Sequence, residues 1–193
     1  MPYVIDFVKN ELLLGKTPMC LALETNNLTA LTRAIDAAMA LPPDRLPGAV
    51  QHALQASFAD GNWLTPAQRQ PDPQRYARHV LQADAQGRYT VVALVWQAGQ
   101  FSPVHSHHTW CALTVVQGEL QEHYYACDRQ SLRATPLHWQ PRAVGAGSSG
   151  TDGLDQVHRL GNAGAEMAIS VHVYGVEAAR VATGVNRVLA LAS

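Results

Sequence analysis

Charge is scarce in this 193-residue chain and is nearly balanced, because 14 Lys and Arg face 15 Asp and Glu for a formal net charge of −1. Proteins that bind nucleic acid usually present a basic face, so no nucleic-acid partner is expected. Long apolar runs are also lacking: none approaches about 18 residues, which argues against a membrane span or a membrane partner. The opening stretch MPYVIDFVKNELLLGK mixes acidic and apolar residues without a small-residue cleavage site, so no signal peptide is expected.

Cysteine is rare as well. Cys20, Cys111 and Cys127 are an odd number at wide spacing, which excludes a disulfide framework and favours a reducing, cytoplasmic location. The chain is long enough to bury a core without disulfide staples, and its length predicts a single structural domain. We expect a monomer.

Residues 1–75 have apolar residues at helical spacing and are predicted to form a helical segment packed on the rest of the chain. One apolar stripe ends at Gly15 and consists of Val4, Phe7, Val8 and Leu12. Asn27 is the expected N-cap of a second helix, which Pro42-Pro43 would end and whose apolar residues are Leu28, Leu31, Ile35 and Met39. A third helix is expected to begin at Pro47 and to end before Asp60, and a short fourth one to begin at Thr65-Pro66.

Residues 76–193 show short β-rich runs separated by turn residues. The expected strands are 76–81, 89–96, 110–116, 120–126, 156–160, 167–173 and 185–191. The Gly/Ser-rich segment 145–153 is predicted to be a mobile loop. Many short strands at this spacing predict an all-β fold with N-terminal helices, built as an antiparallel barrel or sandwich.

Histidines are concentrated in one part of the chain, since seven of the nine lie between His105 and His172. In an extended segment His105 and His107 point to the same side, so both imidazoles could chelate a metal, although solvated loop histidines would give the same pattern. His158 on a later expected strand is a candidate third ligand or an ordinary half-buried histidine. His108 faces away from His107 and is interpreted as outer-sphere or surface. Spacing assigns no role to four others, namely His52, His79, His123 and His138.

Ser170, His172 and Tyr174 share one face of an expected strand. A hydroxyl, an imidazole and a phenol in line can form a hydrogen-bonded relay, and a polar strand face toward solvent is the alternative. No Gly-x-Ser-x-Gly element is present, so a serine hydrolase is disfavoured.

Together these segments resemble the cupin superfamily. Gly99, His105-Ser-His107 and Gly118 have the spacing of the first cupin motif, but Cys111 stands where the motif has glutamate. His158-Arg-Leu-Gly-Asn162 is similar to part of the second motif. The cysteine makes the chain similar to the thiol dioxygenases, specifically to cysteine dioxygenase type I, over about residues 70–175.

This resemblance implies a cupin-type, jelly-roll-like antiparallel barrel at residues 76–193 that holds Fe(II) through His105, His107 and His158. Within Tyr76-Ala-Arg78, the arginine would hold the substrate carboxylate and Tyr76 would support it. The relay would make Tyr174 a hydrogen-bond donor, with His172 and Ser170 behind it. Because three neutral histidines supply no anion, a substrate thiolate is expected to complete the site.

Two further features follow from the resemblance. In eukaryotic members a cysteine at this position forms a thioether with the relay tyrosine, so a Cys111–Tyr174 crosslink is one interpretation and a plain buried Cys111 is the other. Relatives that act on 3-mercaptopropionate tend to carry glutamine at the position of Arg78, so the arginine favours cysteine as substrate.

We therefore expect a thiol dioxygenase that converts L-cysteine and O2 to cysteine sulfinate. One alternative is a dioxygenase of 3-mercaptopropionate or another small thiol acid. Another is a metal-binding cupin without catalysis, which would need neither Arg78 nor the relay. A zinc or manganese cupin isomerase or hydrolase is disfavoured, because those usually keep the carboxylate ligand that Cys111 replaces.

Overall fold

The computed structural model describes residues 18–192, with side chains from residue 26 onward. Two α-helices, α1 (Pro18–Ala38) and α2 (Leu46–Ser57), and a 3-10 helix, η1 (Pro66–Arg69), precede the strands. The strands are β1 (Ala77–Ala83), β2 (Thr90–Trp96), β3 (His105–His107), β4 (Cys111–Gln117), β5 (Leu120–Asp128), β6 (Arg133–Arg142), β7 (Gly147–Gly150), β8 (Gly153–Gly161), β9 (Ala168–Tyr174), β10 (Asn186–Val188) and β11 (Ala190–Leu191). A second 3-10 helix, η2 (Ala178–Arg180), follows β9.

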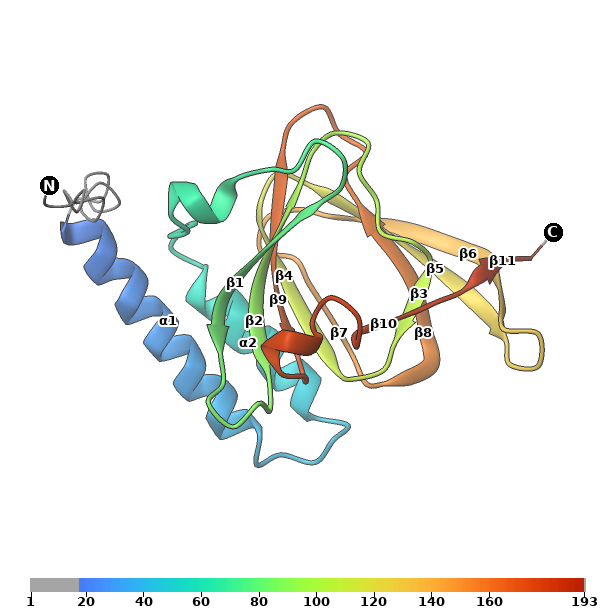
Figure 1. The fold of residues 1–193 in the computed structure, drawn as a ribbon, viewed down its shortest axis with the longest axis horizontal. Coiled ribbons are helices and arrows are strands. Elements are labelled where there is room, and N and C mark those ends of the chain that lie inside the picture. Colours follow the sequence, from blue (N-terminus) through green and yellow to red (C-terminus); the bar gives the residue numbers. More distant parts are fainter. Residues whose placement is uncertain (1–17, 193) are drawn as a thin grey trace, which may run out of the picture.

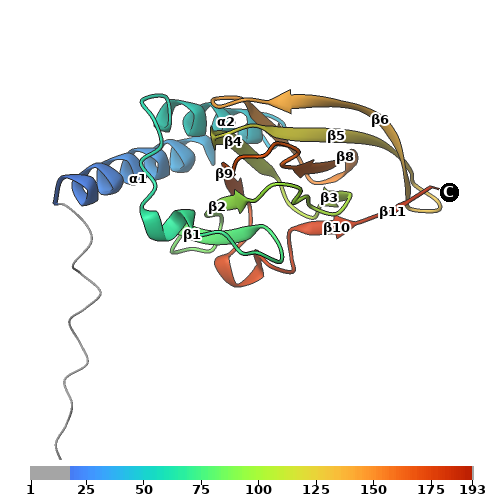
Figure 2. The same ribbon diagram turned by 90° about the horizontal axis from the view of Figure 1, so that it is seen from above.

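The strands form two sheets that curve around a common interior (Figure 1). One sheet has the order β1-β2-β9-β4-β7, and the other has the order β10-β3-β8-β5-β6-β11. All pairings are antiparallel except that of β11 with β6. The helices lie on the outer side of the five-stranded sheet, as the view from above shows (Figure 2). The predicted cupin-type, jelly-roll-like barrel with N-terminal helices is therefore confirmed as the fold.

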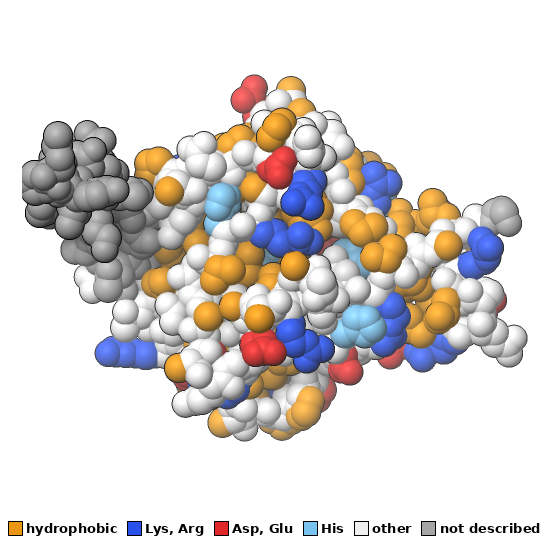
Figure 3. Space-filling model, in the orientation of Figure 1, with side chains coloured by type: hydrophobic (Ala, Val, Ile, Leu, Met, Phe, Trp, Pro, Cys, Tyr) orange, Lys and Arg blue, Asp and Glu red, His pale blue; other side chains and the backbone are white. Residues whose placement is uncertain are grey.

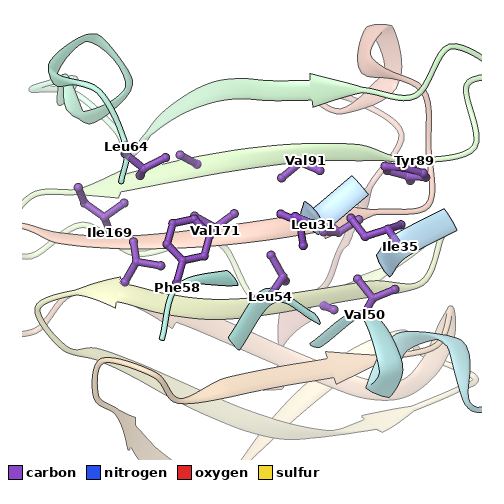
Figure 4. Close-up of a cluster of buried hydrophobic side chains, with 14 of the residues drawn as sticks. Leu31, Ile35, Val50, Leu54, Phe58, Leu64, Tyr89, Val91, Ile169 and Val171 are labelled. Atoms are coloured by element: carbon purple, nitrogen blue, oxygen red, sulfur yellow. The ribbon is translucent and has the colours of Figure 1, made fainter. Parts of the chain in front are cut away.

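Side-chain alternation divides the three central strands β2, β9 and β4 between two hydrophobic cores. Val91, Val171 and their neighbours pack against Leu31 of α1 and Leu54 of α2 (Figure 4). The alternate residues face the barrel interior, where Leu94 and Leu113 lie. Because both faces are covered, β2 and β9 are buried along their whole length.

The helix predictions are confirmed in part. The helix α2 includes Pro47 and buries Val50 and Leu54, and η1 begins directly after Thr65, as expected. The expectation that Asn27 caps the second helix is wrong, because α1 begins at Pro18 and contains Asn27 in its interior. No glycine or proline follows Pro18 up to that point, so nothing interrupts the helix earlier. The stripe Val4 to Leu12 lies outside the described residues.

Six of the seven expected strands are present as single strands, whereas the expected strand 185–191 is divided into β10, which pairs with β3, and β11, which pairs with β6. The strands β3, β6 and β7 lie outside the expected set. The predicted mobile loop 145–153 contains β7, which pairs with β4. A Cβ at Gly147 would lie 2.7 Å from Cγ of Gln51 on α2, so a larger residue at this position would have to displace that side chain. The strand β6 was not expected, because Pro136 and Pro141 interrupt its pattern; it lies near the sheet edge between β5 and β11, where proline is tolerated.

Several large hydrophobic side chains are exposed in the described part of the chain, among them Leu137 and Trp139 on β6. No helix there is long and apolar enough to cross a membrane. On the face shown in Figure 3, side chains of both charge signs lie scattered among hydrophobic ones.

The contact between α2 and the sheet predicts a large stability cost for Leu54→Ala. Leu54 is 0% exposed within the outer core, so truncation leaves a cavity and should lower the free energy of unfolding by about 2–5 kcal/mol. Urea unfolding measures the change. Leu41→Ala is the matched control, because Leu41 is 41% exposed and its truncation should cost well under half as much. Equal costs at the two positions would contradict this account of the core.

Candidate metal centre and active site

Three histidines from two strands converge inside the barrel. His105 and His107 lie on β3, and His158 lies directly opposite His105 on the neighbouring strand β8. All three are at most 7% exposed, and their nearest ligand nitrogens lie within 4.8 Å of one another. The Nε2 atoms of His105 and His107 are 3.2 Å apart. The structure thus brings together the three residues that the sequence proposed as a set.

The outer nitrogens of these rings have partners that direct the inner nitrogens toward one point. Nδ1 of His105 donates to the carbonyl oxygen of Pro103 at 2.9 Å, and Nδ1 of His158 donates to Oε1 of Glu122 at 2.7 Å. An N–H at Nδ1 leaves the lone pair at Nε2. Nε2 of His158 is buried and has no hydrogen-bond partner among the described residues. A buried lone pair without a donor, next to two further imidazoles, fits a metal ion with nitrogen ligands.

Burial keeps His105 and His107 uncharged. Burial, and secondarily the charge of His158, lowers the pKa of His105 to about 3. The same causes hold the pKa of His107 well below its usual value. Neutral imidazole is the form that binds a metal, so the fold maintains the ligand form down to acidic pH.

Glu122 is a site residue that sequence reasoning missed. Its side chain on β5 is 0% exposed and accepts hydrogen bonds from His158, from Nε of Arg142 at 2.7 Å and from Oγ of Ser148 at 3.0 Å. Burial raises the pKa of the carboxyl, but the His158 hydrogen bond and the nearby positive charge outweigh burial and lower the pKa to about 2. The sequence signal that could have identified Glu122 is side-chain alternation along β5, which places Glu122 on the same inward face as Leu120 and Tyr124.

The relay residues lie on the interior face of β9, not toward solvent. Oγ of Ser170 is 2.8 Å from Nε2 of His172, and the Tyr174 hydroxyl is 3.0 Å from Nδ1 of His172. Trp96 on β2, which sequence reasoning did not include, donates its indole N–H to Ser170 Oγ at 3.0 Å. One hydrogen-bond order that fits these distances has the serine proton donated to Nε2 of His172 and Nδ1 of that ring donating to the Tyr174 oxygen. This order leaves the Tyr174 proton free to donate into the cavity.

Tyr76 and Arg78 lie across the same cavity. Arg78 on β1 donates to the Tyr76 hydroxyl at 2.6 Å, and the Tyr76 ring stacks on Trp96 with centroids 4.4 Å apart. The cavity is lined by Arg78, the three histidines and Tyr174, and its apolar wall consists of Leu94, Leu113, Leu160, Val181 and Val185. A cation and a phenol therefore line the same cavity as the three converging histidines.

Cys111 and Tyr174 are directly opposite each other on the paired strands β4 and β9. Opposite residues of an antiparallel pair share one face, which brings the sulfur and the ring to the same side of the sheet. Burial raises the pKa of the Cys111 thiol to about 12, and Sγ lies 3.2 Å from Nδ1 of His107.

The remaining histidines lie away from this cluster. His108 is exposed, with Nδ1 3.3 Å from Arg187, so it is at the surface. His52, His79, His123 and His138 line no part of the cavity. Asn162, the last residue of the second motif, donates to the backbone oxygens of Trp96 and Glu166 and so organises the loops at that end of the barrel.

Buried neutral histidines make the stability of the metal-free protein depend on pH. Burial, and secondarily the charge of His158, lowers the pKa of His172 to about 3, whereas an unfolded histidine titrates near 6.5. Between these values the unfolded state binds protons that the folded state does not, so the free energy of unfolding falls as pH decreases. Each such histidine contributes up to about 1.4 kcal/mol per pH unit.

We expect His172→Asn to reduce this slope between about pH 6 and 5, measured by urea unfolding of metal-free protein. His52→Asn, which replaces an exposed histidine of α2, is the control and should leave the slope unchanged. An unaltered slope in His172→Asn would show that the ring takes up a proton in the folded state.

Solved structures with a similar fold cover about half of the chain. An uncharacterised conserved protein with a double-stranded β-helix domain from Klebsiella pneumoniae has 23% identity and a TM-score of 0.46, covering 58% of this chain and 87% of that one. A protein from Thermus thermophilus has 16% identity and a TM-score of 0.45, covering 58% of this chain and 96% of that one. A cupin domain of an XRE-family transcriptional regulator from Enterobacter cloacae has 15% identity and a TM-score of 0.39, covering 52% and 96%.

The family comparison reaches further along the chain. The profile of the family described as cysteine dioxygenase type I matches residues 50–180, which include every strand that carries a histidine of the cluster or a relay residue. Because this match spans most of the chain, the chain belongs to the cysteine dioxygenase type I family.

Proposed function

We propose that the protein is a non-haem iron thiol dioxygenase that oxidises L-cysteine with O2 to cysteine sulfinate. Membership of the cysteine dioxygenase type I family supports a thiol dioxygenase function. The observation that carries the proposal is the cavity whose lining combines three clustered imidazoles with Arg78 and Tyr174. A site that only stores a metal needs neither the cation nor the phenol.

His105, His107 and His158 are the proposed ligands of Fe(II). Bound there, iron would lower the pKa of a substrate thiol and bring the thiolate together with O2. Three neutral ligands leave the charge of the ion uncompensated, which favours a substrate that arrives as an anion. The apolar wall formed by Leu94, Leu113 and Val185 keeps water away from the reacting atoms.

Arg78 is the proposed carboxylate-binding residue. A guanidinium can form two parallel hydrogen bonds to a carboxylate, and the hydrogen bond to Tyr76 fixes its position at the edge of the cavity. Tyr174 is proposed to donate its free hydroxyl proton to the bound reactants, because His172, Ser170 and Trp96 supply hydrogen bonds only from behind it.

Oxygen consumption by the iron-loaded protein tests the proposal. With L-cysteine we expect O2 uptake and one sulfinate formed per O2, detected by NMR, and weaker kcat/KM with 3-mercaptopropionate. Metal-free protein and the His105→Ala variant are the controls, and neither should consume O2. Higher kcat/KM with 3-mercaptopropionate would assign that thiol acid as the substrate, and no uptake with any thiol would leave a metal-binding cupin.

Replacing Arg78 tests substrate recognition. Arg78→Gln removes the charged contact to the carboxylate and should lower kcat/KM for cysteine roughly 10- to 100-fold, mostly through KM. Cysteamine has no carboxylate, so its kcat/KM should change little. Arg75→Gln is a matched control, since Arg75 is an exposed arginine near β1 that pairs with Asp72. Equal losses for cysteine and cysteamine would remove Arg78 from this role.

The strand register supports a proposed thioether between Cys111 and Tyr174. Formation of the carbon–sulfur bond removes one hydrogen from the thiol and one from the ring, with O2 as the oxidant. Intact-mass spectrometry of protein that has turned over should therefore show a species lighter by two hydrogen atoms. The Cys111→Ser variant should lack this species. Its absence from active wild-type protein would leave Cys111 as a buried apolar residue.

A further inference from the structure

Glu122 is a carboxylate buried within the barrel wall, adjacent to the metal centre. It is 0% exposed, and its two oxygens have different partners. Oε2 accepts from Arg142 at 2.7 Å, while Oε1 accepts from Nδ1 of His158 at 2.7 Å and from Ser148 Oγ at 3.0 Å. These partners belong to β6, β8 and β7, so three strands hold one carboxylate in place.

The three proposed ligands differ in what supports their outer nitrogens. His105 faces the backbone oxygen of Pro103, His107 faces the thiol of Cys111, and His158 faces the carboxylate of Glu122. An imidazole that donates to an anion is a stronger electron donor at its other nitrogen than one that donates to a neutral group. His158 is therefore the ligand whose basicity depends on a charged partner.

We propose that Glu122 is a positioning residue that acts through His158 on the metal. It holds the ring with Nε2 inward and supplies negative charge to a centre whose direct ligands are all neutral. Cys111 replaces the carboxylate of the first cupin motif, and Glu122 supplies a carboxylate that reaches the metal centre through one hydrogen bond to His158. This inference rests on the metal site of the proposed function.

A purely structural ion pair would not need this arrangement. Burying Glu122 and Arg142 costs desolvation that apolar residues of similar volume would avoid, so stability alone does not favour the pair. Arg142 also donates to the Tyr124 hydroxyl at 2.7 Å, which fixes the position of the guanidinium. The hydrogen bond between Glu122 and His158 is therefore the contact through which this carboxylate acts on the metal centre.

Glu122→Gln tests the role by removing the charge while keeping the size. The amide oxygen can still accept from His158, but it is a neutral partner. Anaerobic calorimetric titration with Fe(II) should show affinity weaker by roughly 10- to 100-fold. The Fe(III)/Fe(II) potential should move to more positive values. The negative charge of Glu122 stabilises Fe(III) more than Fe(II), and the substitution removes that charge.

Asp155→Asn is the matched control. Asp155 is on the same strand as His158 but is exposed and pairs with Arg129. Its loss removes one negative charge from β8 and should leave both affinity and potential unchanged. Glu122→Asp restores the charge and should recover much of the potential.

A second variant keeps the test valid if Glu122→Gln does not fold. Folding is at risk because the neutral amide would leave Arg142 without its anion. In Glu122→Gln/Arg142→Met the charge pair is removed together, and the same shifts in affinity and potential are expected. Wild-type affinity and potential in folded Glu122→Gln or in Glu122→Gln/Arg142→Met would overturn the proposal, even if the metal-free protein were less stable. Neither readout requires thiol turnover, so failure here would leave the proposed dioxygenase activity untouched. Iron binding without thiol oxidation in the wild type would refute that activity alone.

Discussion

The alternation of side chains along β2, β9 and β4 is the constraint on which the rest of this structure depends. Each strand sends one set of residues outward to the helices and the other set into the barrel. On β9 the outward set is apolar, with Val171 and Val173, whereas the inward set is Ser170, His172 and Tyr174. The packing of α1 and α2 on the outer side of the sheet therefore allows β9, a strand with a polar interior face, to be buried on both sides.

Electrostatics inside the barrel follow from this burial. Desolvation keeps His105 and His107 neutral, so a cation can bind to their nitrogens without competition from protons. Glu122 is the exception in this interior, and its charge persists because His158, Arg142 and Ser148 all donate to it. The polar groups of the site thus form two hydrogen-bonded systems, one behind His158 and one behind Tyr174, and both direct their free ends into a single cavity.

The resemblance-based prediction of fold and family is confirmed, since the first cupin motif depends on local spacing that the sequence displays directly. Elements stabilised by distant partners were harder to predict. The strand β7 has the composition of a loop, and only its pairing with β4 makes it a strand. Asn27 has the chemistry of an N-cap, but the helix continues through it because the preceding residues are equally compatible with helix.

The sequence by itself determined the spacing of His105 and His107, the period-two pattern of Ser170, His172 and Tyr174, and the replacement of the motif glutamate by Cys111. These are properties of residues close together along one strand. The tertiary structure alone decided that His158 lies opposite His105, that Cys111 faces Tyr174, and that Trp96 and Glu122 support the two ends of the site. The reason is physical: strand register and burial join residues that are 36 to 74 positions apart, and no local pattern records which of them will meet.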